Sequence, residues 1–160
     1  MSLMSSMELT KPGMALTDVV LDLFRVNSLL LMRGDRLVAG LGLTSARWQV
    51  LGAIVYAQRP EPVAWLARDL GSNRQNVQRI VNDLHKEGFV EFQPNPHHRR
   101  AQLVVLTDKG RAAYDDAMRL WTPWANSLAD GHSLKDIGTM AAVVKALRRK
   151  LENSHDADEE

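Results

Sequence analysis

Two different apolar periods lie side by side in the stretch from Ser72 to Thr107, SNRQNVQRIVNDLHKEGFVEFQPNPHHRRAQLVVLT. Its first half has apolar residues at helical spacing: Val77, Ile80, Val81 and Leu84. Its second half holds two strand-like runs, FVEF and AQLVVLT, separated by a loop that contains prolines and an asparagine. Periods of this kind predict a helix followed at once by a β-hairpin.

Another short helix is predicted directly before this unit. Pro62 suits a first helical turn, and the apolar residues up to Gly71 keep helical spacing: Val63, Leu66, Ala67 and Leu70. Ser72 and Gln75 have the spacing of a capping box, which would begin the next helix. Two helices joined by a tight turn and followed by a hairpin predict a winged helix-turn-helix.

Longer helices are predicted on both sides. Thr17 is the expected N-cap of a helix over residues 17–39, and Thr44 caps a shorter helix that ends near QRPEP. After the hairpin, Thr107 opens a long helix in which Pro123 predicts a kink or break. A last helix is expected from Ser133, with an apolar stripe that runs to Leu151.

The predicted fold is therefore mainly α with a small β-hairpin wing (α+β). We expect a single domain over residues 17–152, with the winged helix at about 44–107 and the long flanking helices at about 17–39 and 108–152. Residues 1–16 are interpreted as a flexible N-terminus, and residues 153–160 as an acidic tail. The apolar stripes of the end helices need a partner, and packing against a second copy would bury them.

Composition narrows the function. The 160 residues include no cysteine, which excludes disulfides, thiolate metal sites and thiol redox switches. No apolar run is long enough to span a membrane and no signal peptide is recognisable, so we expect a cytoplasmic protein without a membrane partner. The formal charge is +1, but without the four acids of the terminal DADEE the chain carries +5.

The outer face of the helix after Ser72 predicts DNA reading. On a helical wheel Gln75, Arg79, Asn82 and Lys86 point outward, with Arg74 and Gln78 on one flank. Arginine pairs with the acceptors of guanine, and asparagine or glutamine with adenine. An ordinary solvated face would carry more acids, whereas here the first acid is Asp83. Gln75 has the alternative of being held in the capping box.

The hairpin loop carries a basic tip formed by His97, His98, Arg99 and Arg100. Such a tip suits phosphates or a narrow minor groove. The alternatives are a plain exposed turn or a metal site of a sensor or metal-dependent enzyme, whose candidate ligands are His85, His97, His98 and His132. Adjacent histidines on a hairpin tend to face opposite ways and no cysteine or acid lies in the loop, which disfavours metal.

Nothing in the sequence resembles a catalytic motif, so we predict neither an enzyme nor a cofactor. The four tryptophans are expected mainly in the core, with a ligand pocket as the alternative: Trp48, Trp65, Trp121 and Trp124. A winged helix can also serve as a protein-interaction module that does not read DNA, and this alternative stays open.

The order of these motifs resembles the MarR family of winged-helix transcriptional regulators. The resemblance runs from Thr17 to Leu151 and rests on LTSARWQVLGAI, the segment VAWLARDLGSNRQNVQRIVNDLHKEGFV, the wing, LTDKG and LWTPW. It implies an obligate homodimer, made by the first and last helices, that binds a pseudopalindromic operator in double-stranded DNA and usually represses transcription. It places the recognition helix in the major groove and the wing in the minor groove.

The resemblance also implies individual roles. Helix contacts would come from Ser72, Arg74, Gln75, Gln78 and Arg79, and Arg100 would be the wing arginine. The family usually has an acid two residues before that arginine, where this chain has His98, so the usual brace of the wing is in doubt. Many members release DNA when a small aromatic or phenolic anion binds. Arg47 and Trp48 are the candidates to line such a site.

Overall fold

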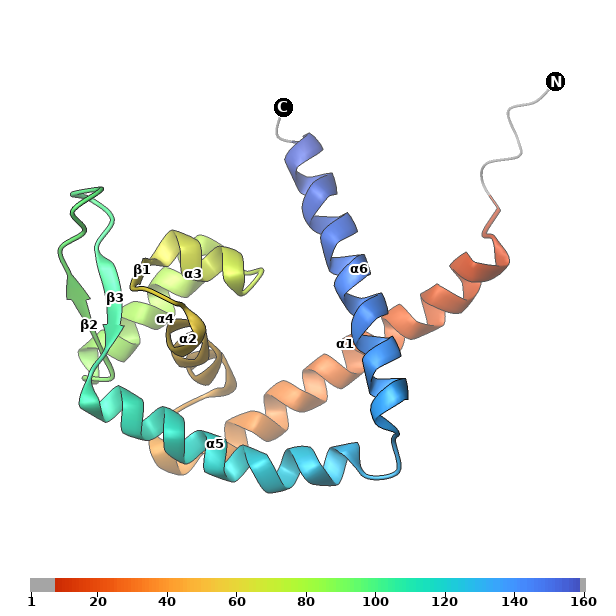
Figure 1. The fold of residues 1–160 in the computed structure, drawn as a ribbon, viewed down its shortest axis with the longest axis horizontal. Coiled ribbons are helices and arrows are strands. Elements are labelled where there is room, and N and C mark those ends of the chain that lie inside the picture. The colour runs from red at the N-terminus through yellow and green to blue at the C-terminus, as the bar shows by residue number, and fades with distance from the viewer. Residues whose placement is uncertain (1–7, 159–160) are drawn as a thin grey trace. The chain divides into compact units, whose positions relative to one another are not determined.

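The computed structural model describes residues 8–158 and confirms a mainly helical fold with a small antiparallel sheet (Figure 1). The elements follow in the order α1 (Lys11–Val38), a 3-10 turn (Ala39–Leu41), α2 (Ser45–Tyr56), β1 (Glu61–Pro62), α3 (Val63–Asp69), α4 (Arg74–Lys86), β2 (Val90–Gln93), β3 (Leu103–Leu106), α5 (Asp108–Ala129) and α6 (Leu134–Asp158). The chain divides after Trp121 into two compact units, each of which is described by itself.

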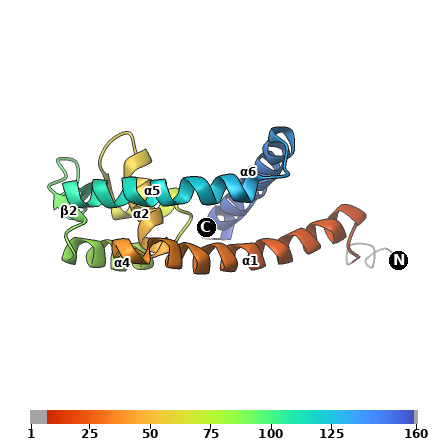
Figure 2. The same ribbon diagram turned by 90° about the horizontal axis from the view of Figure 1, so that it is seen from below.

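Helix α1 begins earlier than the sequence predicted. Its N-cap is Thr10, whose Oγ1 accepts a hydrogen bond of 3.1 Å from the Gly13 amide. Pro12 is tolerated because the first helical turn needs no amide donors. Thr17 was the wrong N-cap, since its hydroxyl lies inside the helix and donates to the Gly13 carbonyl at 2.8 Å. Residues 11–16, predicted as flexible, are therefore helical, and residues 1–7 lie outside the described part. Figure 2 shows the length of α1.

The helix-turn-helix lies at the centre of the first unit. Helices α3 and α4 bury one face each, and their fully buried side chains include Leu66, Val77, Val81 and Leu84. Gly71 in the turn has a φ of +59°, which favours glycine. The predicted capping box was wrong, because Asn73 rather than Ser72 caps α4. The Asn73 side chain accepts from the amides of Gln75 and Asn76 at 2.8 and 3.2 Å.

The wing is a three-stranded antiparallel sheet in the order β1-β3-β2. In the predicted hairpin, Val90 pairs with Leu106 and Gln93 with Leu103. The sequence did not predict β1, which pairs with β3 on its other side. Pro62 was assigned to the first turn of a helix, but it lies in β1 and at the N-cap of α3. An edge strand tolerates proline because its amide is not needed for pairing.

The start of α5 is tied to the segment that follows α4. The Thr107 amide donates to the Phe89 carbonyl at 3.1 Å, and the Thr107 hydroxyl donates to the Gly88 carbonyl at 2.6 Å. Gly110 lies so close that a Cβ there would sit 1.9 Å from the Phe89 carbonyl oxygen. Thr107 and Gly110 therefore hold the start of α5 against the base of the wing.

The last two helices extend beyond their predicted ends. Helix α5 continues through Pro123 to Ala129, so the chain does not break at the proline. Ser133 begins α6 as predicted, because its Oγ accepts from the Asp136 amide at 3.1 Å and donates to the Asp136 carboxylate at 2.7 Å. Helix α6 runs to Asp158, so most of the predicted acidic tail is helical. None of the described helices is long and apolar enough to cross a membrane.

Candidate nucleic-acid interface

Helix α4 gathers the predicted reading residues on its exposed side. Arg74, Gln75, Arg79, Asn82 and Lys86 are exposed, and Gln78 is half-buried. The opposite side is buried in the core of the first unit. Ser72 is exposed in the turn before the helix. The structure therefore brings the predicted helix set onto one surface.

Side-chain contacts organise this surface further. Arg79 Nη2 donates to Asn76 Oδ1 at 3.0 Å, and Arg79 Nη1 lies 3.6 Å from the Asp83 carboxylate. Gln78 Nε2 donates to Asn82 Oδ1 at 2.9 Å. Sequence reasoning missed the parts played by Asn76 and Asp83, although their offsets of −3 and +4 from Arg79 signal neighbours on a helix.

Asn95 organises the wing tip. Its side-chain amide donates to the Ala101 carbonyl at 2.9 Å, and its Oδ1 accepts from the His97 amide at 3.0 Å. The Ala101 amide also donates to the His98 carbonyl at 3.2 Å. These bonds join the two sides of the loop, so Asn95 holds the loop that carries the basic tip. The tip residues are all exposed: His97, His98, Arg99 and Arg100.

The histidines do not gather. His85 Nδ1 lies 3.2 Å from the Val90 carbonyl, and the His85 ring packs on Phe92 with centroids 4.9 Å apart. Among the side chains of residues 8–154, which the structure describes, no group of three His, Asp or Glu is placed to hold a metal ion. The structure therefore offers the metal hypothesis no support.

The candidate ligand residues already have partners within the chain. Arg47 Nη1 donates to the Glu87 carboxylate at 2.9 Å and to the Gly42 carbonyl at 3.2 Å. Trp48 packs edge-on against Trp121, with ring centroids 5.8 Å apart. The ligand role of Arg47 and Trp48 stays a prediction. Glu87, the partner of Arg47, was not anticipated because it lies forty residues away.

The remaining tryptophans differ in environment. Trp124 is half-buried, as are Trp48 and Trp121. Trp65, by contrast, is 41% exposed on α3, so its assignment to the core was wrong. The Arg59 guanidinium lies over the Trp65 ring, 5.3 Å from its centroid, which is a cation-π contact.

Comparison with known proteins adds to this geometry. A model of the MarR family matches residues 41–101, from the approach to α2 to the wing loop. An uncharacterized protein of Mycobacterium tuberculosis is 37% identical over 133 residues, which cover 83% of this chain and 90% of the relative. The chain belongs to the MarR family.

Solved structures share the fold. CouR from Rhodococcus jostii bound to p-coumaroyl-CoA matches with a TM-score of 0.73 and 21% identity, over 81% of this chain and 91% of CouR. CouR bound to a 23-mer DNA duplex matches with a TM-score of 0.69 and 24% identity, over 79% and 89%. This MarR-family chain thus has the fold of DNA-binding transcription regulators.

A third relative is described as an activator. The transcriptional activatory protein BadR of Rhodopseudomonas palustris is 34% identical over 98 residues, which cover 58% of this chain and 54% of BadR.

Proposed function

We propose that the chain is a sequence-specific transcription regulator that acts as a homodimer on a pseudopalindromic operator. The observation that carries this proposal is the exposed side of α4, where Arg74, Gln75, Arg79 and Asn82 stand on a helix whose other side is buried. An α-helix fits the major groove, and these side chains suit base edges.

The wing supplies charge beside that helix. His97, His98, Arg99 and Arg100 project at the end of the hairpin, which extends from the winged helix in Figure 1. The two arginines of this tip suit phosphates or the minor groove, so they add affinity without choosing a base. In this arrangement residues 44–107 bind DNA, with Ser72 and Gln78 at the edge of the contact.

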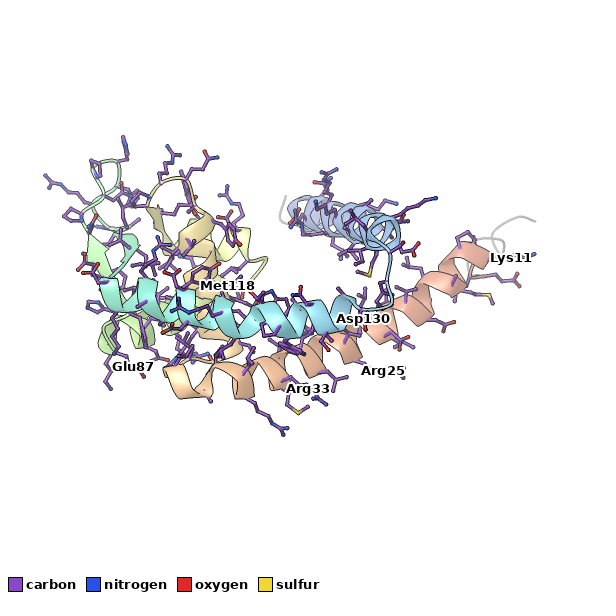
Figure 3. The ribbon with its side chains drawn as sticks, turned by 60° about the horizontal axis from the view of Figure 1, so that its bottom comes forward. Lys11, Arg25, Arg33, Glu87, Met118 and Asp130 are labelled. Atoms are coloured by element: carbon purple, nitrogen blue, oxygen red, sulfur yellow. The ribbon has the colours of Figure 1, made fainter. Side chains whose placement is uncertain are left out.

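The exposed apolar side chains of α1 support a dimer. Large apolar residues along this helix are 40% or more exposed, among them Val19, Leu21, Leu23, Phe24, Val26 and Leu29. Figure 3 follows α1 from Lys11 past Arg25 to Arg33, with side chains projecting along its length. Helix α6 also exposes Met140, Val143 and Leu151. A second copy would remove this surface from water, as expected of dimerisation helices over 17–39 and 108–152.

Light scattering tests the dimer. We expect twice the chain mass of 17.9 kDa without DNA. Phe24→Asp and Leu147→Asp would each place two unpaired charges in the interface, and they should dissociate or unfold the protein. Gln49→Glu adds the same charge to an exposed position of α2, outside the dimerisation helices, and serves as the control. A stable wild-type monomer would contradict the proposal.

We propose repression as the mode of regulation, relieved by a small aromatic ligand. The DNA-bound CouR is named a repressor, and the CouR bound to p-coumaroyl-CoA holds an aromatic thioester. The edge-to-face pair of Trp48 and Trp121 is an aromatic surface of the first unit against which such a ligand would pack. A reporter with the operator inside its promoter distinguishes repression from activation. Titration of the DNA complex with p-coumaroyl-CoA tests release.

Selection of bound sequences from random double-stranded DNA tests the main proposal. We expect an inverted repeat to be enriched, with binding that weakens steeply as salt rises. A pool without enrichment would contradict sequence-specific binding. If salt also had no effect on any residual binding, the exposed side of α4 would be a protein-interaction surface.

A further inference from the structure

Arg79 is held from two sides on the exposed surface of α4. Its Nη2 donates to Asn76 Oδ1 at 3.0 Å, and its Nη1 lies 3.6 Å from Asp83 Oδ2. Asn76 precedes Arg79 by three residues and Asp83 follows it by four, so both partners lie along the same strip of the helix. The Arg79 side chain itself is 67% exposed, which leaves it accessible to a ligand.

The two contacts leave the guanidinium able to bind further acceptors. Each terminal nitrogen of arginine carries two hydrogens, and Nε carries one. The bond to Asn76 uses one hydrogen of Nη2, so enough donors remain for an acceptor pair. Guanine presents such a pair in the major groove, N7 and O6, and the planar fork of arginine matches both atoms at once.

Holding the side chain in advance lowers the cost of binding. A free arginine has many rotamers and loses that freedom when it docks on a base. Asn76 and Asp83 restrict Arg79 before DNA arrives, although each contact on an exposed helix is weak. The restriction favours one orientation of the fork and therefore one base position.

The negative charge of Asp83 distinguishes base reading from phosphate binding. A carboxylate 3.6 Å from the guanidinium offsets its charge and repels a nearby phosphate. An arginine that binds the phosphate backbone of DNA would therefore gain nothing from Asp83. A base edge carries no net charge, so Asp83 costs much less there.

We propose that Arg79 reads a guanine at one fixed position of each half-site, and that Asn76 and Asp83 are positioning residues that hold its guanidinium for this contact. The inference rests on the proposed function, because it names the base that the exposed side of α4 recognises.

The test repeats the selection from random DNA with wild type and with Arg79→Ala, then measures affinities for the enriched operator and for random DNA. We expect the variant to lose one guanine preference per half-site and about tenfold in operator affinity per half-site, with a much smaller loss on random DNA. Arg79→Lys keeps the charge but lacks the fork, so it should lose the preference while retaining affinity for random DNA.

The positioning residues make a sharper arm of the experiment. Asp83→Asn keeps the shape and removes the charge, so guanine discrimination should fall about twofold per half-site while affinity for random DNA rises. Asn76→Ala should lower discrimination by a similar factor without that rise. Asp116→Asn, which removes an acid paired with Arg119 on α5, is the matched control and should leave the ratio unchanged.

Each outcome has one meaning. No enriched sequence with wild type contradicts the proposed function itself. An enriched operator whose base preferences survive Arg79→Ala and Arg79→Lys overturns the inference and leaves the function standing. Loss of the guanine preference in both Arg79 variants, with no change in discrimination for Asp83→Asn and Asn76→Ala, overturns the positioning role.

Discussion

Arg47, near the start of α2, forms an ion pair with Glu87, the residue directly after α4, with 2.9 Å between Nη1 and Oε2. The same guanidinium donates to the Gly42 carbonyl at 3.2 Å, just before α2. The corner between α1 and α2 is thereby tied to the end of the candidate reading helix. Glu87, the C-cap residue of α4, is labelled in Figure 3.

Arg47→Ala should lower the free energy of unfolding by about 1 kcal/mol, because it removes a partly shielded ion pair and a hydrogen bond to a carbonyl. Urea unfolding measures the change. Arg119→Ala removes the more exposed pair with Asp116 and should cost less stability than Arg47→Ala. The charge exchange Arg47→Glu with Glu87→Arg should recover part of the loss. Equal losses of stability in the two alanine variants would mean that the Arg47–Glu87 pair contributes no more than an exposed ion pair.

Gly110→Ala should destabilise the protein by about 3 kcal/mol or more. The added methyl would meet the Phe89 carbonyl oxygen at 1.9 Å, and a backbone atom at the wing base has little room to move. Gly138→Ala on α6 is the control, since its Cβ would meet nothing within 4 Å. Alanine in an open helix interior should instead stabilise by up to about 1 kcal/mol. Thermal unfolding of both variants decides, and a tolerated Gly110→Ala would disprove the close approach.

Glu61→Gln should stabilise the protein at neutral pH. Burial raises the pKa of the Glu61 carboxyl, and the neighbouring Asp69 raises it further. The folded state therefore binds the proton more tightly than the unfolded chain. The stability that this proton adds to the folded state is fully present below the usual pKa of 4.5. It is lost as the pH rises through the raised pKa of Glu61 in the folded protein. At pH 7 the ionised pair opposes folding, and glutamine removes that opposition.

Denaturant unfolding at pH 7 and pH 4 measures this effect. The free energy of unfolding of Glu61→Gln should exceed that of wild type by a fraction of a kcal/mol at pH 7, and the difference should shrink toward pH 4. Glu91→Gln on β2, which removes an exposed carboxylate of the same sheet, is the control. A gain that is the same at both pH values would contradict the assignment.

Arg100→Ala should weaken binding to the operator and to random DNA by similar factors, because a wing cation meets phosphate rather than a base. The slope of log affinity against log salt should fall by roughly 1 per subunit. Arg148→Ala, which removes an exposed arginine of α6, is the control and should leave the slope unchanged. A loss confined to the operator would instead make Arg100 a base reader.

The sequence predicted those features whose signals are local. The helical spacing of the apolar residues in α4 and the two strand-like runs of the hairpin are confirmed, because neighbouring residues create these signals. N-caps were less certain, since Ser72 and Asn73 are both good caps and only the fold chooses between them. β1 is two residues long and has no period to detect. The Arg47–Glu87 pair joins distant parts of the chain, and no spacing rule predicts it.

The wing hairpin is closed at both ends, by Asn95 at the tip and by Thr107 at the base. Residues 96–100 lie beyond the first closure and have no part in the second. Their chemistry is thus separable from the scaffold, as a loop is in an antibody domain. This five-residue segment could be exchanged for that of another family member, with Asn95 and Ala101 retained. The hybrid would combine the DNA contact of one regulator's wing with the fold of the other. The hairpin is in this sense a natural grafting site.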